Sequence, residues 1–143
     1  MRKNLSTKQI KKYSRQIDLK NVGIIGQKKI LDSSVLVVGA GGLGCPVIDY
    51  LSRAGVGLIG IIDYDKVDAS NIHRQSIYTY KDIGKYKIEV LKRKLKDINP
   101  DVKTKIFKSK ITNKNVNKIL KQLEEVEVLV LLVNEEKSFH KAN

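Results

Sequence analysis

The sequence contains no tryptophan, two prolines and one cysteine among 143 residues. The single cysteine, Cys45, excludes an internal disulfide and a Cys-x-x-Cys zinc site within this sequence. No apolar run approaches the length of a membrane-spanning helix, and no apolar stretch of a secretory signal follows the basic amino terminus. We therefore expect a cytoplasmic protein that has no membrane partner and binds no zinc.

Acidic residues are scarce relative to basic ones. The 28 lysines and arginines outnumber the 15 aspartates and glutamates, which gives a net charge of +13. Such an excess favours nucleic acid or an acidic protein as a partner. The lysines, however, occur in every segment, and residues 92–94 (KRK) fall on the outer side of a helical pattern, where solvated charges are expected. We predict that nucleic acid is not a partner.

The most informative segment is a glycine-rich loop at residues 39–44 (GAGGLG). It directly follows the apolar run 35–38 (VLVV), and Asp63 and Asp65 come about twenty residues later. This order is typical of a nucleotide site at the carboxyl end of a parallel strand, where backbone N–H groups and a helix amino terminus face an anion. The glycines predicted to contact the ligand are Gly39, Gly41, Gly42 and Gly44.

Apolar periodicity predicts an α/β fold. Residues 35–38, 58–62, 102–106 and 128–133 have the pattern of strands, and helical spacing recurs over 43–54, 88–98 and 116–123. Two short helices, one capped by Thr7 and one over 24–31, precede them, and a polar loop spans 64–82. Right-handed βαβ units then give a Rossmann-like, doubly wound parallel sheet. We expect one domain over residues 1–143 that is incomplete at its carboxyl end, because only about four strands are present.

Polar residues outside the glycine loop supply candidate ligands. Asp63, at a predicted strand tip, can accept hydrogen bonds from ribose hydroxyls, and Asn71 and Arg74 in the long loop can reach phosphates. Lys87 begins a predicted helix, where its charge adds to the positive helix end. Considered alone, Arg74 could equally be a residue of an ordinary solvated loop, and Lys87 could equally be an exposed surface lysine. Nothing in the spacing requires Arg15 to reach across a dimer interface.

Together these segments resemble the ThiF/MoeB/HesA family, the bacterial relatives of ubiquitin-activating enzymes. The resemblance covers most of the sequence, and dehydrogenases that share the glycine loop lack its Asn-x-x-Arg-Gln segment. The matching segments are residues 13–16 (YSRQ), 39–44 (GAGGLG), 54–57 (AGVG), 63–65 (DYD), 70–75 (SNIHRQ), 84–87 (GKYK) and 98–100 (INP).

The resemblance implies a reaction, a cofactor and partners. A homodimeric enzyme would bind Mg-ATP and adenylate the carboxyl-terminal glycine of a ubiquitin-like sulfur carrier protein. The resemblance implies that the four loop glycines, Asp63, Asp65 and Gln75 bind the nucleotide. It makes Asn71, Arg74 and Lys87 phosphate ligands and Arg15 the arginine supplied by the second subunit. This chemistry needs charge neutralisation rather than a general base, because the attacking carboxylate is already ionised at neutral pH.

The sequence departs from the family pattern near its carboxyl end. Where the family has Asp-Cys-Thr-Asp-Asn, whose second Asp helps to hold magnesium, residues 132–136 are LVNEE. Glu135 is the candidate replacement ligand, although its longer side chain displaces the carboxylate. A truncated, non-catalytic module that binds a nucleotide or dimerises is therefore the alternative function. A nicotinamide-dependent oxidoreductase is a further alternative, supported by the glycine loop alone.

Overall fold

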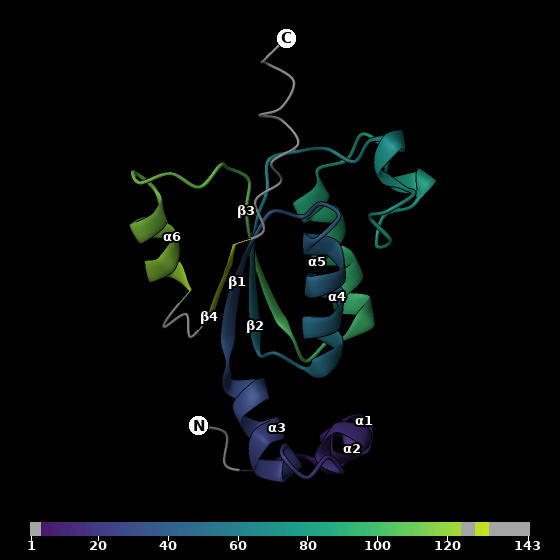
Figure 1. Cartoon of the computed structure of the whole chain (residues 1–143), viewed down its shortest axis with the longest axis vertical. Helices are drawn as coiled ribbons and strands as arrows, with labels where there is room; N and C mark the ends of the chain where they lie inside the picture. Colours follow the sequence, from purple (N-terminus) through teal and green to yellow (C-terminus); the bar gives the residue numbers. More distant parts are fainter. Residues whose placement is uncertain (1–3, 124–127, 132–143) are drawn as a thin grey trace.

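The computed structural model describes residues 4–123 and 128–131 and consists of one parallel sheet with helices on both faces (Figure 1). The strand order is β3-β2-β1-β4, and all three pairings are parallel. The strands are β1 (Ser34–Val38), β2 (Leu58–Ile62), β3 (Lys103–Phe107) and β4 (Val128–Leu131). This arrangement confirms the predicted Rossmann-like α/β fold.

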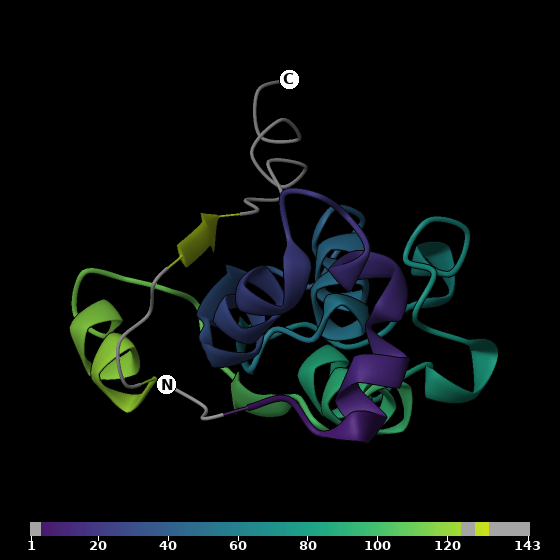
Figure 2. The ribbon, with the colours of Figure 1, turned by 90° about the horizontal axis from the view of Figure 1, so that it is seen from below.

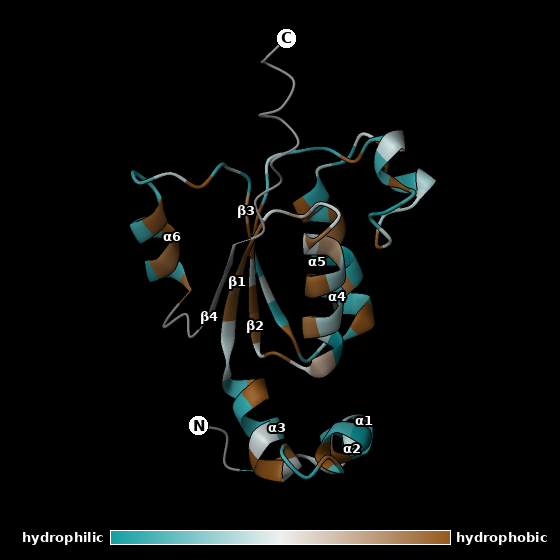
Figure 3. Cartoon of the chain, in the orientation of Figure 1, coloured by the Kyte–Doolittle hydropathy of each residue, from teal (hydrophilic) through white to brown (hydrophobic). Residues whose placement is uncertain are grey.

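Helices cover the two faces of the sheet unequally (Figures 1 and 3). On one face α4 (Gly44–Ala54) and α5 (Lys87–Ile98) pack against Val37 and Ile61, which belong to the larger buried cluster. On the other face α6 (Val116–Gln122) contributes Ile119, which packs against Leu36. Because successive strand residues point to opposite faces, strands covered on both faces are apolar on both, as β1 is after Ser34 and as β2 is throughout.

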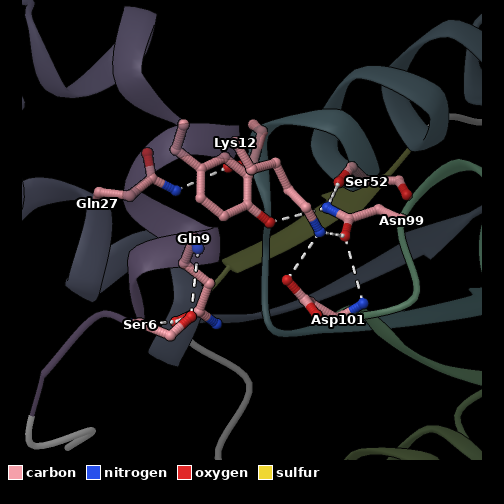
Figure 4. A network of polar contacts seen from close by, with 9 residues as sticks. Ser6, Gln9, Lys12, Gln27, Ser52, Asn99 and Asp101 are labelled. Atoms are coloured by element: carbon pink, nitrogen blue, oxygen red, sulfur yellow. Dashed lines mark hydrogen bonds and ion pairs between the residues drawn. The ribbon is translucent and has the colours of Figure 1, made fainter.

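Three amino-terminal helices lie at the end of the sheet where the strands begin (Figure 1), and Figure 2 shows the molecule from that end. They are α1 (Thr7–Lys12), α2 (Ser14–Ile17) and α3 (Gly23–Asp32), and α3 leads directly into β1. The residue that caps α1 is Ser6 rather than the predicted Thr7, because the Ser6 hydroxyl accepts from the Gln9 backbone N–H in a reciprocal capping box (Figure 4). The prediction of a helix over 24–31 is confirmed.

The buried face of α4 differs from the one that the sequence pattern suggests. Leu43 and Tyr50, two residues in the apolar spacing, are 66% and 70% exposed, whereas Cys45, Ile48 and Ser52 are fully buried. The inner face thus combines Ile48 with the small residues Cys45 and Ser52, and Leu43 and Tyr50 form an exposed stripe along the helix. None of the helices in the described ranges is both long enough and apolar enough to cross a bilayer.

The long segment between β2 and α5 has its own structure, including the 3₁₀ helices η1 (Ala69–Asn71) and η2 (Tyr80–Asp82). Asp82 fastens it to α5, because its carboxylate accepts from Arg93 at 2.7 Å and from Lys94 at 2.6 Å. Burial alone would raise the pKa of Asp82, but the hydrogen bonds from Lys94 and Thr79 hold that pKa well below its usual range. The contacts of Asp82 thus hold this segment, which carries several of the predicted ligands, against α5.

Candidate nucleotide site

A cleft of about 530 Å³ opens at the carboxyl ends of β1 and β2. This volume is in the range of small-molecule sites, and the switch point of a doubly wound sheet is where such sites form. All the residues that the sequence predicts to bind the nucleotide or its phosphates line it, including Arg74 and Lys87, whereas Arg15 does not. They are Gly39, Gly41, Gly42, Gly44, Asp63, Asp65, Asn71, Arg74, Gln75 and Lys87.

The glycine loop makes a sharp turn as it leaves β1. Gly39 has φ +98°, a conformation that L side chains rarely adopt, and its N–H donates to the Ile62 carbonyl at 2.8 Å. The loop then leads into α4, whose first residue, Gly44, and the preceding Leu43 also line the cleft. Backbone N–H groups at a helix amino terminus favour an anion at this position.

Ala40, in the middle of the loop, is completely buried and is held by three side chains. Its N–H donates to Asp63 Oδ2 at 2.8 Å, and its carbonyl accepts from the Tyr78 hydroxyl at 2.9 Å and from Cys45 Sγ at 3.3 Å. Asp63 Oδ1 also accepts from the Asp65 N–H at 2.7 Å. Asp63 is therefore a buried support of the loop, a role that the prediction of a ribose ligand did not include.

Tyr78 is a site residue that sequence reasoning missed, because a tyrosine in a polar loop has no spacing that links it to the glycine turn. Cys45 behaves as a packing residue. Burial raises the pKa of its thiol to about 11, so the thiol is neutral at physiological pH.

Arg74 lies against the glycine loop. A Cβ placed on Gly42 would be 3.6 Å from both Cδ and Nε of Arg74, which is ordinary van der Waals contact. Its Nη1 donates to the Ser70 carbonyl at 2.9 Å and contacts His73 Nε2 at 2.8 Å. Arginine can only donate, so His73 Nε2 is the acceptor in this contact. The loop between β2 and α5 thus places the guanidinium of Arg74 beside the glycine turn, which is of the type that binds phosphate.

Lys87 is buried, although the sequence alone also allowed a surface lysine. It is 4% exposed, and its Nζ lies 3.9 Å from Asp65 Oδ2. Its backbone N–H donates to the Asp65 carbonyl at 3.0 Å, which ties the start of α5 to the end of β2. A buried ammonium group with one distant carboxylate partner is well placed to meet a second anion in the cleft.

Gln75 is 1% exposed and lines the cleft, and its Oε1 has no hydrogen-bond partner among the described residues. Asn71 completes the capping box of η1, since its side-chain oxygen accepts from the Asp68 N–H at 3.0 Å. The Asn71 side chain is therefore held at the cleft wall. The buried, unsatisfied Gln75 oxygen needs a donor, which a ligand or a water molecule in the cleft would supply.

Arg15 lies away from this cleft. Its neighbours in the YSRQ segment point inward. Tyr13 is 2% exposed and accepts from Asn99 Nδ2, while Gln16 donates to the Ala54 carbonyl at the end of α4. Arg15 is exposed on α2, at the end of the sheet where the strands begin. Figure 4 shows the same network around Asn99, which also accepts from Lys12.

The predicted magnesium ligand, Glu135, lies outside the described residues. Within the described ranges no group of three or more His, Cys, Asp or Glu side chains could hold a metal ion. The carboxylate of Asp63 already accepts two backbone N–H groups, and that of Asp65 faces Lys87. The described residues thus do not fit a metal centre of their own.

Comparison with known proteins agrees with this geometry. The profile described as the ThiF family matches residues 13–133. The chain belongs to the ThiF family.

The curated proteins that the chain is similar to include adenylyltransferases. The chain is 42% identical over 113 residues to the sulfur carrier protein adenylyltransferase of Thermus thermophilus, covering 79% of this chain and 42% of that protein. It is 44% identical over 118 residues to the adenylyltransferase and sulfurtransferase MOCS3 of Culex quinquefasciatus, covering 82% of this chain and 27% of that protein. The chain thus spans less than half the length of these relatives.

Solved structures share the fold. The E. coli tRNA N6-threonylcarbamoyladenosine dehydratase TcdA, in complex with AMP, superposes with a TM-score of 0.82 at 25% identity, covering 90% of this chain and 51% of that one. E. coli MccB, with AMPCPP and MccA, superposes with a TM-score of 0.70 at 29% identity, covering 86% of this chain and 37% of that one. Both comparison proteins were solved with an adenine nucleotide.

Proposed function

We propose that the chain is the nucleotide-binding part of an ATP-dependent adenylyltransferase that activates the carboxyl-terminal glycine of a ubiquitin-like sulfur carrier protein in the cytoplasm. The observation that carries the proposal is the convergence of Arg74, Lys87 and the glycine loop on one cleft. Family membership and the names of the relatives support it.

The reaction requires a carrier carboxylate to attack the α-phosphorus of ATP. A bond forms between the carboxylate oxygen and phosphorus, the bond to the bridging oxygen breaks, and pyrophosphate leaves with its electrons. Arg74, Lys87 and the N–H groups of the loop would offset the charge that builds up on the phosphates. Asn71 would contact phosphate, and Asp63, Asp65 and Gln75 would orient the nucleotide. When bound, magnesium would neutralise phosphate charge, and we keep Glu135 as its proposed ligand.

A second copy of the chain would supply Arg15. A five-residue strand is about 16 Å long, so Arg15 at one end of the sheet cannot reach the cleft at the other end of its own sheet. The exposed stripe on α4 runs between these two ends, since Leu43 lines the cleft and Ala54 accepts from Gln16 of α2. If two α4 helices packed antiparallel about a twofold axis, each Arg15 would approach the partner's cleft.

The test is ATP–pyrophosphate exchange in the presence of a ubiquitin-like sulfur carrier. We expect Arg74→Ala and Lys87→Ala each to lower exchange by at least a hundredfold. Lys92→Ala, which removes an exposed lysine of α5 outside the cleft lining, is the matched control. Exchange that survives both cleft substitutions would refute the assigned roles. ATP binding measured by calorimetry without any exchange would instead favour the non-catalytic binding module.

Mixing two inactive variants tests the dimer. In an equimolar mixture of Arg15→Ala and Lys87→Ala, a mixed dimer has one site with both native residues, so exchange should return to about a quarter of the wild-type level. No recovery on mixing, with both variants folded, would contradict a site shared between two subunits.

A further inference from the structure

Three lysines and two tyrosines gather at the mouth of the cleft, beyond the residues discussed above. Lys66 Nζ lies 5.0 Å and Lys108 Nζ 4.1 Å from the ring centroid of Tyr86, and Lys110 Nζ lies 4.7 Å from that of Tyr64. These residues follow β2, precede α5 and follow β3, so three separate segments build the group. We call these five residues the lysine–tyrosine rim.

The lysines of the rim have no acidic partner within the part of the chain that the structure describes. All three are exposed, and none of them has a carboxylate within 4.0 Å among the residues that the structure describes. Lys12 and Lys94, by contrast, pair with Asp101 and Asp82. Three ammonium groups held beside two rings concentrate positive charge at one place, and an anion that binds there relieves their mutual repulsion.

The position of the rim indicates what kind of anion it meets. Tyr64, Lys66 and Lys110 also line the cleft, whereas Lys108 does not. The rim therefore extends from the cleft onto the surrounding surface, further than a nucleotide confined to the cleft would reach. Because ammonium groups already cover the Tyr86 ring, that ring is a poor platform for stacking a nucleobase, and the rim presents charge rather than an aromatic face.

We propose that the lysine–tyrosine rim binds an acidic face of the protein whose carboxyl terminus enters the cleft. This inference rests on the proposed function, since a protein substrate whose last residue reaches the cleft must place its body at the mouth. Carboxylates on that body would pair with Lys66, Lys108 and Lys110. The contact would accelerate and orient docking, and salt would weaken it.

Lys108 provides the sharpest test, because it belongs to the rim but not to the cleft lining. The probe is a fluorescently labelled peptide rich in glutamate that ends in Gly-Gly, and binding to the full chain is measured by anisotropy. We expect Lys108→Glu to weaken binding roughly three- to tenfold. Lys108→Arg, which keeps the charge, should bind like wild type. Lys92→Glu makes the same charge change at an exposed site on α5 and should also bind like wild type.

Two further probes distinguish other occupants. A lysine-rich peptide with the same Gly-Gly end should bind more weakly than the acidic one, and added salt should reduce the difference. Equal binding of the two peptides, or unchanged binding by Lys108→Glu, would overturn the proposal. Tighter binding of a single-stranded oligothymidylate than of the acidic peptide, lost in Lys108→Glu, would also overturn it and assign the rim to nucleic acid.

The experiments distinguish a wrong proposal about the rim from a wrong proposal about the function. If exchange with a carrier occurs and Lys108→Glu leaves the KM for that carrier unchanged, the adenylyltransferase function stands and the rim proposal is wrong. If the acidic peptide binds with the expected dependence on Lys108 but no exchange follows with any carrier, the rim binds acidic chains and the proposed reaction is wrong.

Discussion

Replacing Asp63 with asparagine tests whether this buried carboxylate holds the glycine loop. Its two oxygens accept from the Ala40 and Asp65 N–H groups at 2.8 and 2.7 Å, and the residue is only 9% exposed. Asparagine has nearly the same shape, but only one of its side-chain ends accepts, so its NH₂ group must face one of the two N–H donors. Leaving a buried donor unsatisfied, and losing the charge-assisted bond, should destabilise the fold by about 2–3 kcal/mol.

The assay is urea unfolding with a parallel thermal melt. A loss of this size should lower the Tm by roughly 6–12 °C for a domain of this length, and ATP affinity should fall about tenfold as the loop N–H groups lose their orientation. Asp68→Asn is the matched control. Asp68 is exposed and caps η1 by accepting from the Ser70 N–H, a role that asparagine fills equally well. Equal stability of Asp63→Asn and Asp68→Asn would refute the reasoning.

Other substitutions test the fold around the site. Gly57→Ala should cost more than about 3 kcal/mol, because the new Cβ would lie 2.1 Å from the Leu31 carbonyl oxygen. Gly84→Ala has open space but φ +83°, so a loss of about 1 kcal/mol in the same urea titration is expected, and equal losses would contradict the steric argument. Asp82 has a lowered pKa in the folded protein, so its contribution to stability is present at neutral pH and is lost as the pH falls below about 4. Asp82→Asn should therefore make the free energy of unfolding less dependent on pH below about 4. An unchanged curve would contradict the role of Asp82 in joining the loop to α5. Cys45, whose thiol pKa is raised to about 11, should resist iodoacetamide at neutral pH until urea unfolds the protein, and rapid labelling of the native chain would contradict its burial.

The local sequence pattern was sufficient to predict the strands of the sheet and the glycine loop at the carboxyl end of β1. The runs that form β1 and β2 are apolar on both faces, and only a covered parallel strand tolerates that composition. The glycine turn and the two following aspartates then placed the cleft at the strand tips. Spacing was less reliable for α4, because Leu43 and Tyr50 share a helical face with core residues in the pattern but are exposed in the fold. Periodicity reports that a helix is amphipathic and does not show which apolar side chains fit beneath it.

By itself, the sequence determined the succession of strands and helices along the chain and the nucleotide-type turn, because these depend on contacts between neighbours along the chain. Its resemblance to a known family supplied most of the polar residues predicted for the site. Only the tertiary structure decided that Tyr78 and Cys45 meet at the carbonyl of Ala40, that Lys87 is buried, and that Arg15 lies at the opposite end of the sheet. These facts depend on how helices and loops distant in sequence pack onto the strands, and no local pattern records the direction in which a packed side chain points.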